Sequence, residues 1–368
     1  MPRVIGLMSG SSLDGLDIAC VDFSFAHNHW SFAFVQTETV PYSSDWVDRL
    51  STATNLDARS YLLLHTSYGH YLGQCVRTFL DKYQLNNSDI VLISSHGHTV
   101  FHEPWNFMTG QIGDGAAIVA ESQLTVVSDL RALDVAHGGQ GAPIVPIGEK
   151  YLFGQYRLLL NLGGIANITD QKHHIAFDIC PANRILNKLC REYRNTDYDE
   201  NGQCASQGEI NENLLKELNQ FDYYKKIYPK SLSNSFGLDL IYPILKLTNE
   251  SIENLLRTYV EHIVQQICLS IRMIIEQEKQ NENTYENCQI LITGGGAHNQ
   301  FLIEQLRVRL NEQFHIEIAN CDVRLIDFKE ALIMAFIGLL RLENQPNVLS
   351  SVTGAKFDTI GGALWKNN

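Results

Sequence analysis

The predicted elements of this sequence occur in the same order twice, and this internal repeat is the strongest constraint on its fold. In the first half, two apolar runs flank the polar turn Ser9–Gly15, a helical stretch follows over about 60–80, and a buried strand over 89–95 ends in a Gly-containing turn. In the second half, the range 157–169 again predicts strand, Gly turn and strand, and a long helix leads into the strand and glycines of 289–299. Repetition of this kind favours two like α/β domains that face one cleft, with chance similarity as the alternative.

The first polar turn has the composition of a phosphate-binding loop. Gly10 and Gly15 let a ligand approach the backbone, and the serine hydroxyls and neighbouring N–H groups can form a concavity that holds an anion. The carboxylates of Asp14 and Asp17 beside such a phosphate are most simply explained by a hydrated Mg²⁺ between them. An ordinary hairpin turn is the alternative, because Gly, Ser and Asp all suit turns.

The range 6–17, with the sequence GLMSGSSLDGLD, resembles the nucleotide loop of the anhydro-N-acetylmuramic acid kinases, which usually reads MSGTSLDGxD. Ser11 stands where the family usually has Thr, so the hydroxyl is retained. The resemblance implies a two-domain actin-like α/β fold, a duplicated ribonuclease H-like kinase fold with an interdomain active-site cleft. It also implies Mg²⁺ at Asp14, directly or through water, and ATP at Gly10, Ser11, Ser12, Leu13, Asp14, Gly15, Leu16 and Asp17.

The strongest domain boundary is the stretch 138–143, where three glycines and a proline break any regular element. We expect a first domain over 1–137, completed by 345–368, and a second over 138–344. Arg131 and Asp134 lie at the entrance to this stretch. They would form an inter-domain ion pair, or Arg131 would bind a substrate carboxylate. The family lines its substrate with this motif and muramic acid carries a lactyl carboxylate, so the resemblance favours the second interpretation.

Asp178 is the candidate catalytic residue. It ends an apolar run before a Pro turn, where a poorly solvated carboxylate suits general-base work. Alternatively, it caps the helix expected to begin near Asn183. The family usually reads FDTGPGN here, with the aspartate as catalytic base, and Pro181 and Asn183 are retained. Three neighbouring positions depart from the family, which puts the shape of the turn in doubt: Ile179, Cys180 and Ala182.

Further matches extend the predicted site across the chain. The segment His96-Gly97-His98-Thr99 is similar to the family's SHGQT, with a simple turn as the alternative. Lys329-Glu330-Ala331 is similar to its KEA, and the alternative there is that Glu330 interacts favourably with the helix dipole in the first turn of a helix. Segments similar to DxxGxxAxxG, PKS and SVTGA lie at 199–208, 229–231 and 350–355, with Asp199 alternatively a turn residue. Collinear matches of this kind are more specific than one Gly-rich loop. The resemblance implies sugar contacts at Thr99, Arg131, Asp134, Asn183 and Glu330, and further ATP contacts at Gly163, Gly164, Asn167, Gly294, Gly295 and Gly296.

Composition limits the other classes of function. A net charge of −13 gives no basic surface for nucleic acid. We expect a cytoplasmic protein with no membrane partner, because no apolar run has the length of a membrane span and no leader pattern opens the chain. The eight cysteines form no C-x-x-C pair and mostly lie in apolar runs, which indicates buried thiols, and the histidines lack the spacing of a zinc site.

The resemblance implies a specific enzyme, a phosphotransferase to an alcohol group. It would open the anhydro ring of 1,6-anhydro-N-acetylmuramic acid with water and phosphorylate O6, giving N-acetylmuramic acid 6-phosphate in murein recycling and amino-sugar catabolism. The family also suggests a homodimer. One alternative is a kinase of a plain anhydrosugar such as levoglucosan, which has no use for a carboxylate-binding Arg131. Another is a non-catalytic actin-like nucleotide switch, against which the retention of Asp178 and Glu330 argues.

Overall fold

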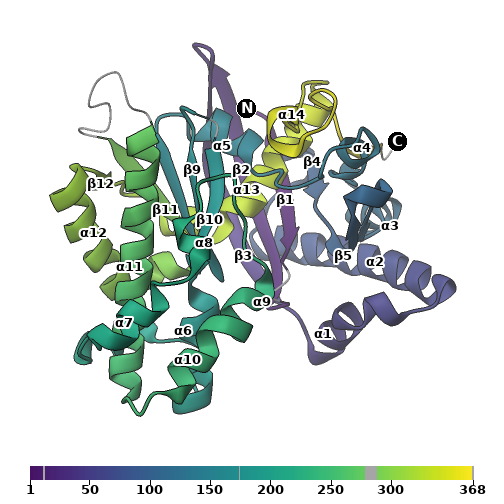
Figure 1. The fold of residues 1–368 in the computed structure, drawn as a ribbon. Coiled ribbons are helices and arrows are strands. Elements are labelled where there is room, and N and C mark those ends of the chain that lie inside the picture. The colour runs from purple at the N-terminus through teal and green to yellow at the C-terminus, as the bar shows by residue number, and fades with distance from the viewer. Residues whose placement is uncertain (11–12, 174, 278–287, 367–368) are drawn as a thin grey trace. The chain divides into compact units, whose positions relative to one another are not determined.

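The structure is a computed structural model that describes residues 1–10, 13–173, 175–277 and 288–366 (Figure 1). The chain divides into two compact units, one formed by Met1–Gly154 with Phe328–Asn368 and the other by Gln155–Asp327. The first unit therefore extends past the Gly- and Pro-rich stretch that we expected to end it, and the chain re-enters this unit at Phe328 rather than at 345.

The first unit is built on a six-stranded sheet with the order β13-β7-β4-β1-β2-β3. Three antiparallel strands form one half of it: β1 (Arg3–Ser9), β2 (Gly15–Ala26) and β3 (His29–Pro41). Beyond β1 lie two parallel strands and an antiparallel edge strand: β4 (Ile90–Ser95), β7 (Val126–Ser128) and β13 (Ala363–Trp365). A separate hairpin consists of β5 (His98–Glu103) and β6 (Met108–Ile112).

The helices of the first unit include the long α2, which we predicted over about 60–80. They are α1 (Ser44–Ser51), α2 (Ala58–Lys82), α3 (Gly115–Ser122), α4 (Ala132–Ala136), α5 (Pro146–Leu152) and α14 (Ser350–Thr353). The Asp57 side chain accepts hydrogen bonds from the N–H groups of Arg59 and Ser60, which fixes the start of α2. Tyr68 and Leu72 on its inner face are fully buried in the core against the sheet.

Helix α13 (Val323–Leu342) contains a long apolar run, and nearly all of its second half is buried. A Cβ on Gly6 of β1 would lie 1.9 Å from the carbonyl oxygen of Ala331, so only glycine allows this helix to approach the strand so closely. The helix is kinked at Phe328, where φ is −113°. Two helices meet at this kink, and Glu330 lies in the first turn of the second one, as one interpretation of the sequence proposed.

The second unit is built on a five-stranded sheet with the order β10-β9-β8-β11-β12. Three antiparallel strands are followed by two parallel ones: β8 (Leu158–Leu162), β9 (Ile165–Asp170), β10 (Ile175–Pro181), β11 (Gln289–Thr293) and β12 (Glu317–Ile318). Its helices are α6 (Asn183–Arg194), α7 (Glu212–Leu218), α8 (Asp222–Lys225), α9 (Asn234–Phe236), α10 (Tyr242–Leu247), α11 (Ile252–Gln277) and α12 (Gln300–Phe314).

The two units share one topology. In each sheet, the first strand of a meander is flanked on one side by the second and third strands and on the other by the parallel fourth and fifth strands. The repeat predicted from the sequence is therefore confirmed, and the chain has the duplicated ribonuclease H-like, actin-like α/β fold. The expected cleft stays a prediction.

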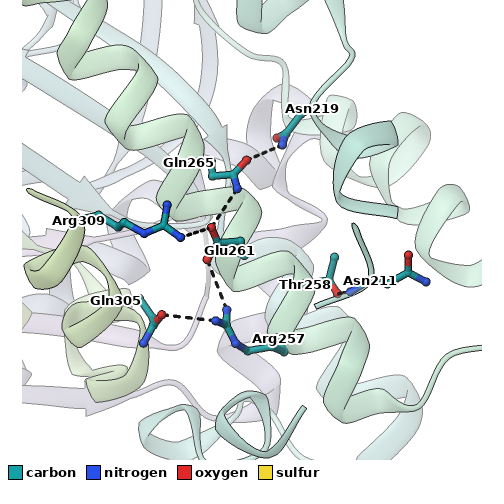
Figure 2. Close-up of polar contacts among 8 residues, drawn as sticks. All are labelled: Asn211, Asn219, Arg257, Thr258, Glu261, Gln265, Gln305 and Arg309. Carbon is teal, nitrogen blue, oxygen red and sulfur yellow. Dashed lines mark hydrogen bonds and ion pairs between the residues drawn. The ribbon is translucent and has the colours of Figure 1, made fainter. Parts of the chain in front are cut away.

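Helix α11 is the long helix that we predicted before the strand of 289–299. Its apolar face fills the core of the second unit, and it also carries a buried carboxylate (Figure 2). The Glu261 side chain, 2% exposed, accepts hydrogen bonds from Arg309 Nη2 at 2.8 Å and Gln265 Nε2 at 2.9 Å. Arg257 Nη1 lies 3.6 Å from its other oxygen. A buried charge needs compensating partners, and here they join α11 to α12 through Arg309.

The remaining composition-based expectations concern thiols, metal sites and membrane spans. All eight cysteines are free, six of them are buried, and Cys288 and Cys321 are half-buried. Within the described ranges, no three His, Cys, Asp or Glu side chains are grouped as a metal site would require. No helix in this part of the chain combines the length and apolar character needed to cross a bilayer.

Candidate functional site

The predicted nucleotide loop joins β1 to β2. Gly10 directly follows β1, Leu13 and Asp14 precede β2, and Ser11 and Ser12 lie outside the described residues. Leu13 has a φ of 58°, in the left-handed region that side chains with a Cβ rarely adopt. Strain of this kind at a turn suggests a functional constraint. Asp14 is exposed at this turn.

The start of β2 anchors the loop to the sheet. Gly15 and Leu16 are buried, and Leu16 pairs with Ser9 at the end of β1. The Asp17 carboxylate accepts a hydrogen bond from Thr39 Oγ1 of β3 at 2.6 Å. The sheet therefore holds the carboxylate of Asp17, and Asp14 is the more exposed of the two residues.

A buried polar network lies directly beneath this loop, and sequence reasoning missed it. Ser9 Oγ lies 3.0 Å from His98 Nδ1 and accepts a hydrogen bond from the Tyr42 hydroxyl at 2.8 Å. The Tyr42 hydroxyl lies 2.5 Å from that of Tyr68. Burial raises the pKa of Tyr42 to about 12 and lowers the pKa of His98. The network is therefore uncharged at neutral pH, and it fixes the last residue before the loop.

Thr99 lies in β5 and is exposed. Its hydroxyl accepts a hydrogen bond from Gln111 Nε2 of the paired strand β6 at 3.3 Å. The predicted segment 96–99 therefore connects the buried strand β4, through Gly97, to the separate β5–β6 hairpin. Its contact with a sugar stays a prediction.

The Arg131 guanidinium is held by two acceptors. Nε donates to His96 Nε2 at 2.8 Å, and Nη1 donates to the Gly141 carbonyl at 2.6 Å. The Nδ1 atom of His96 lies 2.9 Å from the Gly97 carbonyl, which assigns its proton to Nδ1 and leaves Nε2 as the acceptor. Burial, followed by the charge of Arg131, lowers the pKa of His96 to about 3. A neutral histidine therefore positions the cation.

Asp134 holds the Gly-rich turn. Its carboxylate is fully buried and accepts hydrogen bonds from the Gly141 N–H at 2.8 Å and from Thr353 Oγ1 at 2.7 Å. A Cβ on Gly139 would lie 2.2 Å from Asp134 Oδ2, so the turn can close on the carboxylate only with glycine there. Arg131 and Asp134 belong to one unit and bond to other groups of it, so the inter-domain ion pair between them is wrong.

The segment Lys329-Glu330 combines a buried and an exposed charge. Lys329 Nζ lies 3.2 Å from Glu149 Oε1 in a buried ion pair. Glu330 is exposed and interacts electrostatically with Arg131: burial lowers the pKa of Arg131, and the negative charge of Glu330 opposes this change. The structure therefore brings together Arg131 and Glu330, which the sequence separates widely.

In the second unit, Asn183 lies between the two predicted Gly turns. Its N–H donates to the Gly163 carbonyl at 3.2 Å, and its Nδ2 donates to the Leu162 carbonyl at 2.8 Å. Its side-chain oxygen and nitrogen lie 3.0 and 3.7 Å from the positions that Cβ atoms on Gly296 and Gly295 would occupy. Asn183 thereby joins the β8–β9 turn to the turn after β11. Gly294, which we also predicted to belong to the turn after β11, precedes Gly295 and Gly296 and has a φ of 83°, in the left-handed region.

Asp178 lies within β10, opposite Asn167 of β9 and beside a register shift. Its Oδ2 accepts a hydrogen bond from the Leu232 N–H at 2.9 Å, and its carbonyl accepts one from the Tyr223 hydroxyl at 2.6 Å. Burial raises the pKa of Asp178, and the bond from Leu232 partly opposes this. Two expectations are corrected. Asp178 does not end the strand, which continues to Pro181, and it does not cap α6, which follows Ala182 without a side-chain cap.

The segment 228–232 supports this carboxylate, and the sequence had given it no role. The Lys230 carbonyl accepts a hydrogen bond from the Asp178 N–H at 3.3 Å. Its ammonium lies 5.4 Å from the ring centre of Phe177 and 5.0 Å from that of Tyr223, and burial lowers the pKa of this lysine. The match to PKS at 229–231 was the available signal, but only the tertiary structure connects it to Asp178.

Asp199 is a turn residue, as one interpretation of the sequence proposed. Its two oxygens accept hydrogen bonds from the N–H groups of Cys204 and Ala205, both at 2.9 Å. Arg194 Nη1 of α6 lies 3.6 Å away. This carboxylate therefore organises the loop after α6.

The geometry can be compared with known proteins. The sequence profile described as anhydro-N-acetylmuramic acid kinase matches residues 2–367, nearly the whole chain. The chain belongs to the anhydro-N-acetylmuramic acid kinase family. It is therefore a kinase, and the match spans both units.

Curated relatives and solved structures give the following similarities. The anhydro-N-acetylmuramic acid kinases of Hydrogenovibrio crunogenus and Pasteurella multocida are each 32% identical to this chain, over 98% of it and 97% and 96% of their own lengths. That of Bacillus thuringiensis subsp. konkukian is 31% identical over 98% of both chains. Component A of the Acidaminococcus fermentans (R)-2-hydroxyglutaryl-CoA dehydratase is 12% identical over 91% of this chain and 96% of its own, with a TM-score of 0.43. The fold assignment rests on the sheet topology and the family, not on this weak structural likeness.

Proposed function

We propose that this kinase hydrolytically opens the anhydro ring of 1,6-anhydro-N-acetylmuramic acid and phosphorylates O6, with Asp178 as general base. The observation that carries the role of Asp178 is its environment. The carboxylate is half-buried, one oxygen is fixed by the Leu232 N–H, and burial raises its pKa. A general base is most effective when its pKa lies closer to the working pH than that of a free carboxyl group.

The proposed reaction follows from these groups. Asp178 takes a proton from water while the water oxygen bonds to C1 of the sugar, and the bond between C1 and O6 breaks. O6 then bonds to the γ-phosphoryl group of ATP, and ADP leaves. Phosphoryl transfer depends mainly on positioning and charge neutralisation, so the reaction requires no nucleophilic side chain.

The sugar-binding part of the proposal rests on Arg131. His96 and Gly141 hold two of its nitrogen atoms, and Glu330 provides an opposite charge nearby. A fixed guanidinium suits the lactyl carboxylate, which levoglucosan lacks. Asp134 would act through the turn that it holds, and Thr99 and Asn183 would contact the sugar directly.

ATP would bind to the β1–β2 loop and to the Gly turns of the second unit. Magnesium fits the exposed carboxylate of Asp14, since Mg²⁺ commonly uses one or two carboxylates together with phosphates and water. Bound there, the ion would neutralise phosphate charge. The family also supports a homodimer in the cytoplasm, which sedimentation analysis and cell fractionation would test.

The test measures ADP release from Mg·ATP with 1,6-anhydro-N-acetylmuramic acid in ¹⁸O-labelled water. Wild type should place ¹⁸O on C1 of a 6-phosphorylated product, and Asp178→Asn should abolish turnover. The control is Asp222→Asn, which removes an exposed carboxylate of the same unit and should leave turnover unchanged. Full turnover in Asp178→Asn contradicts the role of base, and turnover with levoglucosan alone contradicts the substrate.

A further inference from the structure

We propose that Glu149 is a positioning residue for the sugar site around Arg131 and Glu330, and that it acts through its buried ion pair with Lys329. The inference rests on the proposed function and adds a residue that lies outside the segments resembling the family's motifs. Glu149 belongs to α5 and is 6% exposed, and Lys329 belongs to α13 and is 8% exposed. Glu149 Oε1 lies 3.2 Å from Lys329 Nζ.

Stability alone does not account for a buried ion pair. Moving two charges out of water costs free energy that their attraction often fails to return, and apolar side chains of similar size are often as stable. Apolar contacts are also non-directional. A charge-assisted hydrogen bond instead holds the ammonium at a defined distance from one oxygen. We therefore assign the pair between Glu149 and Lys329 to geometry rather than to stability.

The geometry that the pair sets is the rotation of one helical turn. Lys329 lies in the first turn after the kink at Phe328, and the exposed Glu330 follows it directly. Successive residues of an α-helix point about 100° apart around its axis, so fixing Lys329 also fixes the direction of Glu330. The same face of α13 meets α5 one turn later, since a Cβ on Gly148 would lie 2.5 Å from Ile333 Cγ1. Helix α5 therefore contacts α13 on the face next to Glu330.

The chain from the Gly-rich turn to α5 contacts both charged residues of the proposed sugar site. At its start, the Gly141 carbonyl accepts the hydrogen bond from Arg131 Nη1 at 2.6 Å. At its end, Glu149 holds Lys329, next to Glu330. Arg131 and Glu330 also interact electrostatically. The placement of one charge relative to the other thus depends on this single segment, and losing its contact with Lys329 should misplace Glu330.

The experiment compares two changes that should have opposite effects on stability and on sugar binding. In Glu149→Leu with Lys329→Met, apolar side chains replace the pair, so stability in urea titrations should be kept while the direction is lost. In Glu149→Gln, an oxygen still accepts from Lys329, but the buried ammonium loses its counter-charge, so stability should fall. The KM for 1,6-anhydro-N-acetylmuramic acid should rise roughly 10-fold in the apolar double variant and stay within about twofold of wild type in Glu149→Gln.

The matched control makes the same two substitutions at an accessible ion pair of the same unit. Glu38→Leu with Lys82→Met should leave the KM for the sugar and the KM for ATP unchanged. The route through Glu330 is tested by adding Glu330→Gln, which by itself should raise the KM for the sugar. In that background the apolar double variant should raise the KM hardly further, because residues that act through one another are not additive.

Three results would overturn the proposal: a KM for the sugar that follows stability, so that Glu149→Gln is the more impaired; an equal rise in the KM for ATP; or a full further rise in the Glu330→Gln background. An unchanged KM in Glu330→Gln itself would refute the sugar contact of Glu330 and this inference with it. If Glu149→Gln does not fold, the apolar double variant and the Glu330→Gln background still decide.

The proposed reaction can fail independently of this inference. Wild type that binds the anhydrosugar in calorimetry but does not turn it over would refute the reaction alone. The same variants are then compared by their Kd for the sugar, with the same expected order. An equal Kd in wild type and the apolar double variant would refute the positioning role.

Discussion

The contact between His96 and Arg131 gives the sharpest prediction for substrate specificity. His96 is 3% exposed, and its Nε2 accepts the hydrogen bond from Arg131 Nε at 2.8 Å. In His96→Leu this acceptor is lost, whereas His96→Gln keeps a side-chain oxygen that can accept. We expect the Leu variant to bind the anhydrosugar weakly and the Gln variant to recover part of the affinity.

The magnitude follows from the kind of bond that is lost. A hydrogen bond to a charged group contributes about 1.5–3 kcal/mol, and each 1.4 kcal/mol changes an equilibrium constant tenfold. The KM for 1,6-anhydro-N-acetylmuramic acid should therefore rise roughly 10- to 100-fold in His96→Leu. The kcat should change less, because His96 acts through Arg131 and contacts no reacting atom in this proposal.

Steady-state kinetics with both sugars separates positioning from a general structural role. The KM for levoglucosan, which has no carboxylate for Arg131, should be nearly the same in wild type and His96→Leu. An unchanged KM for the muramic sugar in a folded Leu variant would refute the reasoning. An equal rise for both sugars would show that His96 merely stabilises the fold.

Three further predictions follow from the structure. The Leu232 N–H favours the charged form of Asp178, so Leu232→Pro should raise the pKa of this base. The acidic limb of the pH–rate profile should then move to higher pH, and a limb that stays in place contradicts the assignment of Asp178 as the base. Gly6→Ala would force a Cβ to 1.9 Å from the Ala331 carbonyl oxygen, so it should lower the free energy of unfolding, measured by urea titration, by about 1–3 kcal/mol or more. A Gly6→Ala variant as stable as wild type would refute this packing of α13 on β1. Burial lowers the pKa of His262 to about 3, below its unfolded value of 6.5, so the unfolded state binds more protons between these pH values and stability falls as pH falls through this window. In His262→Gln, the slope of the free energy of unfolding against pH should be shallower by up to about 1.4 kcal/mol per pH unit. An unchanged slope would refute the attribution to His262.

The sequence determined the duplication and the main elements that repeat in it. The helix predicted over about 60–80 is α2, and the strand predicted over 89–95 is β4. These predictions succeed because strand and helix periodicity are local properties, and each buried face repeats along its own segment. The match of residues 2–367 to the kinase family likewise reflects an ordered set of short segments that are recognisable in the sequence alone.

Only the tertiary structure decided what each candidate residue contacts. The donor that fixes Asp178 lies 54 positions later in the chain, at Leu232, and the hydroxyl that holds Asp134 lies 219 positions later, at Thr353. Burial likewise made His96 a neutral acceptor rather than a cation. Contacts across such separations depend on how whole sheets and helices pack, which is a sum of many small interactions from distant segments, and no local pattern encodes that sum.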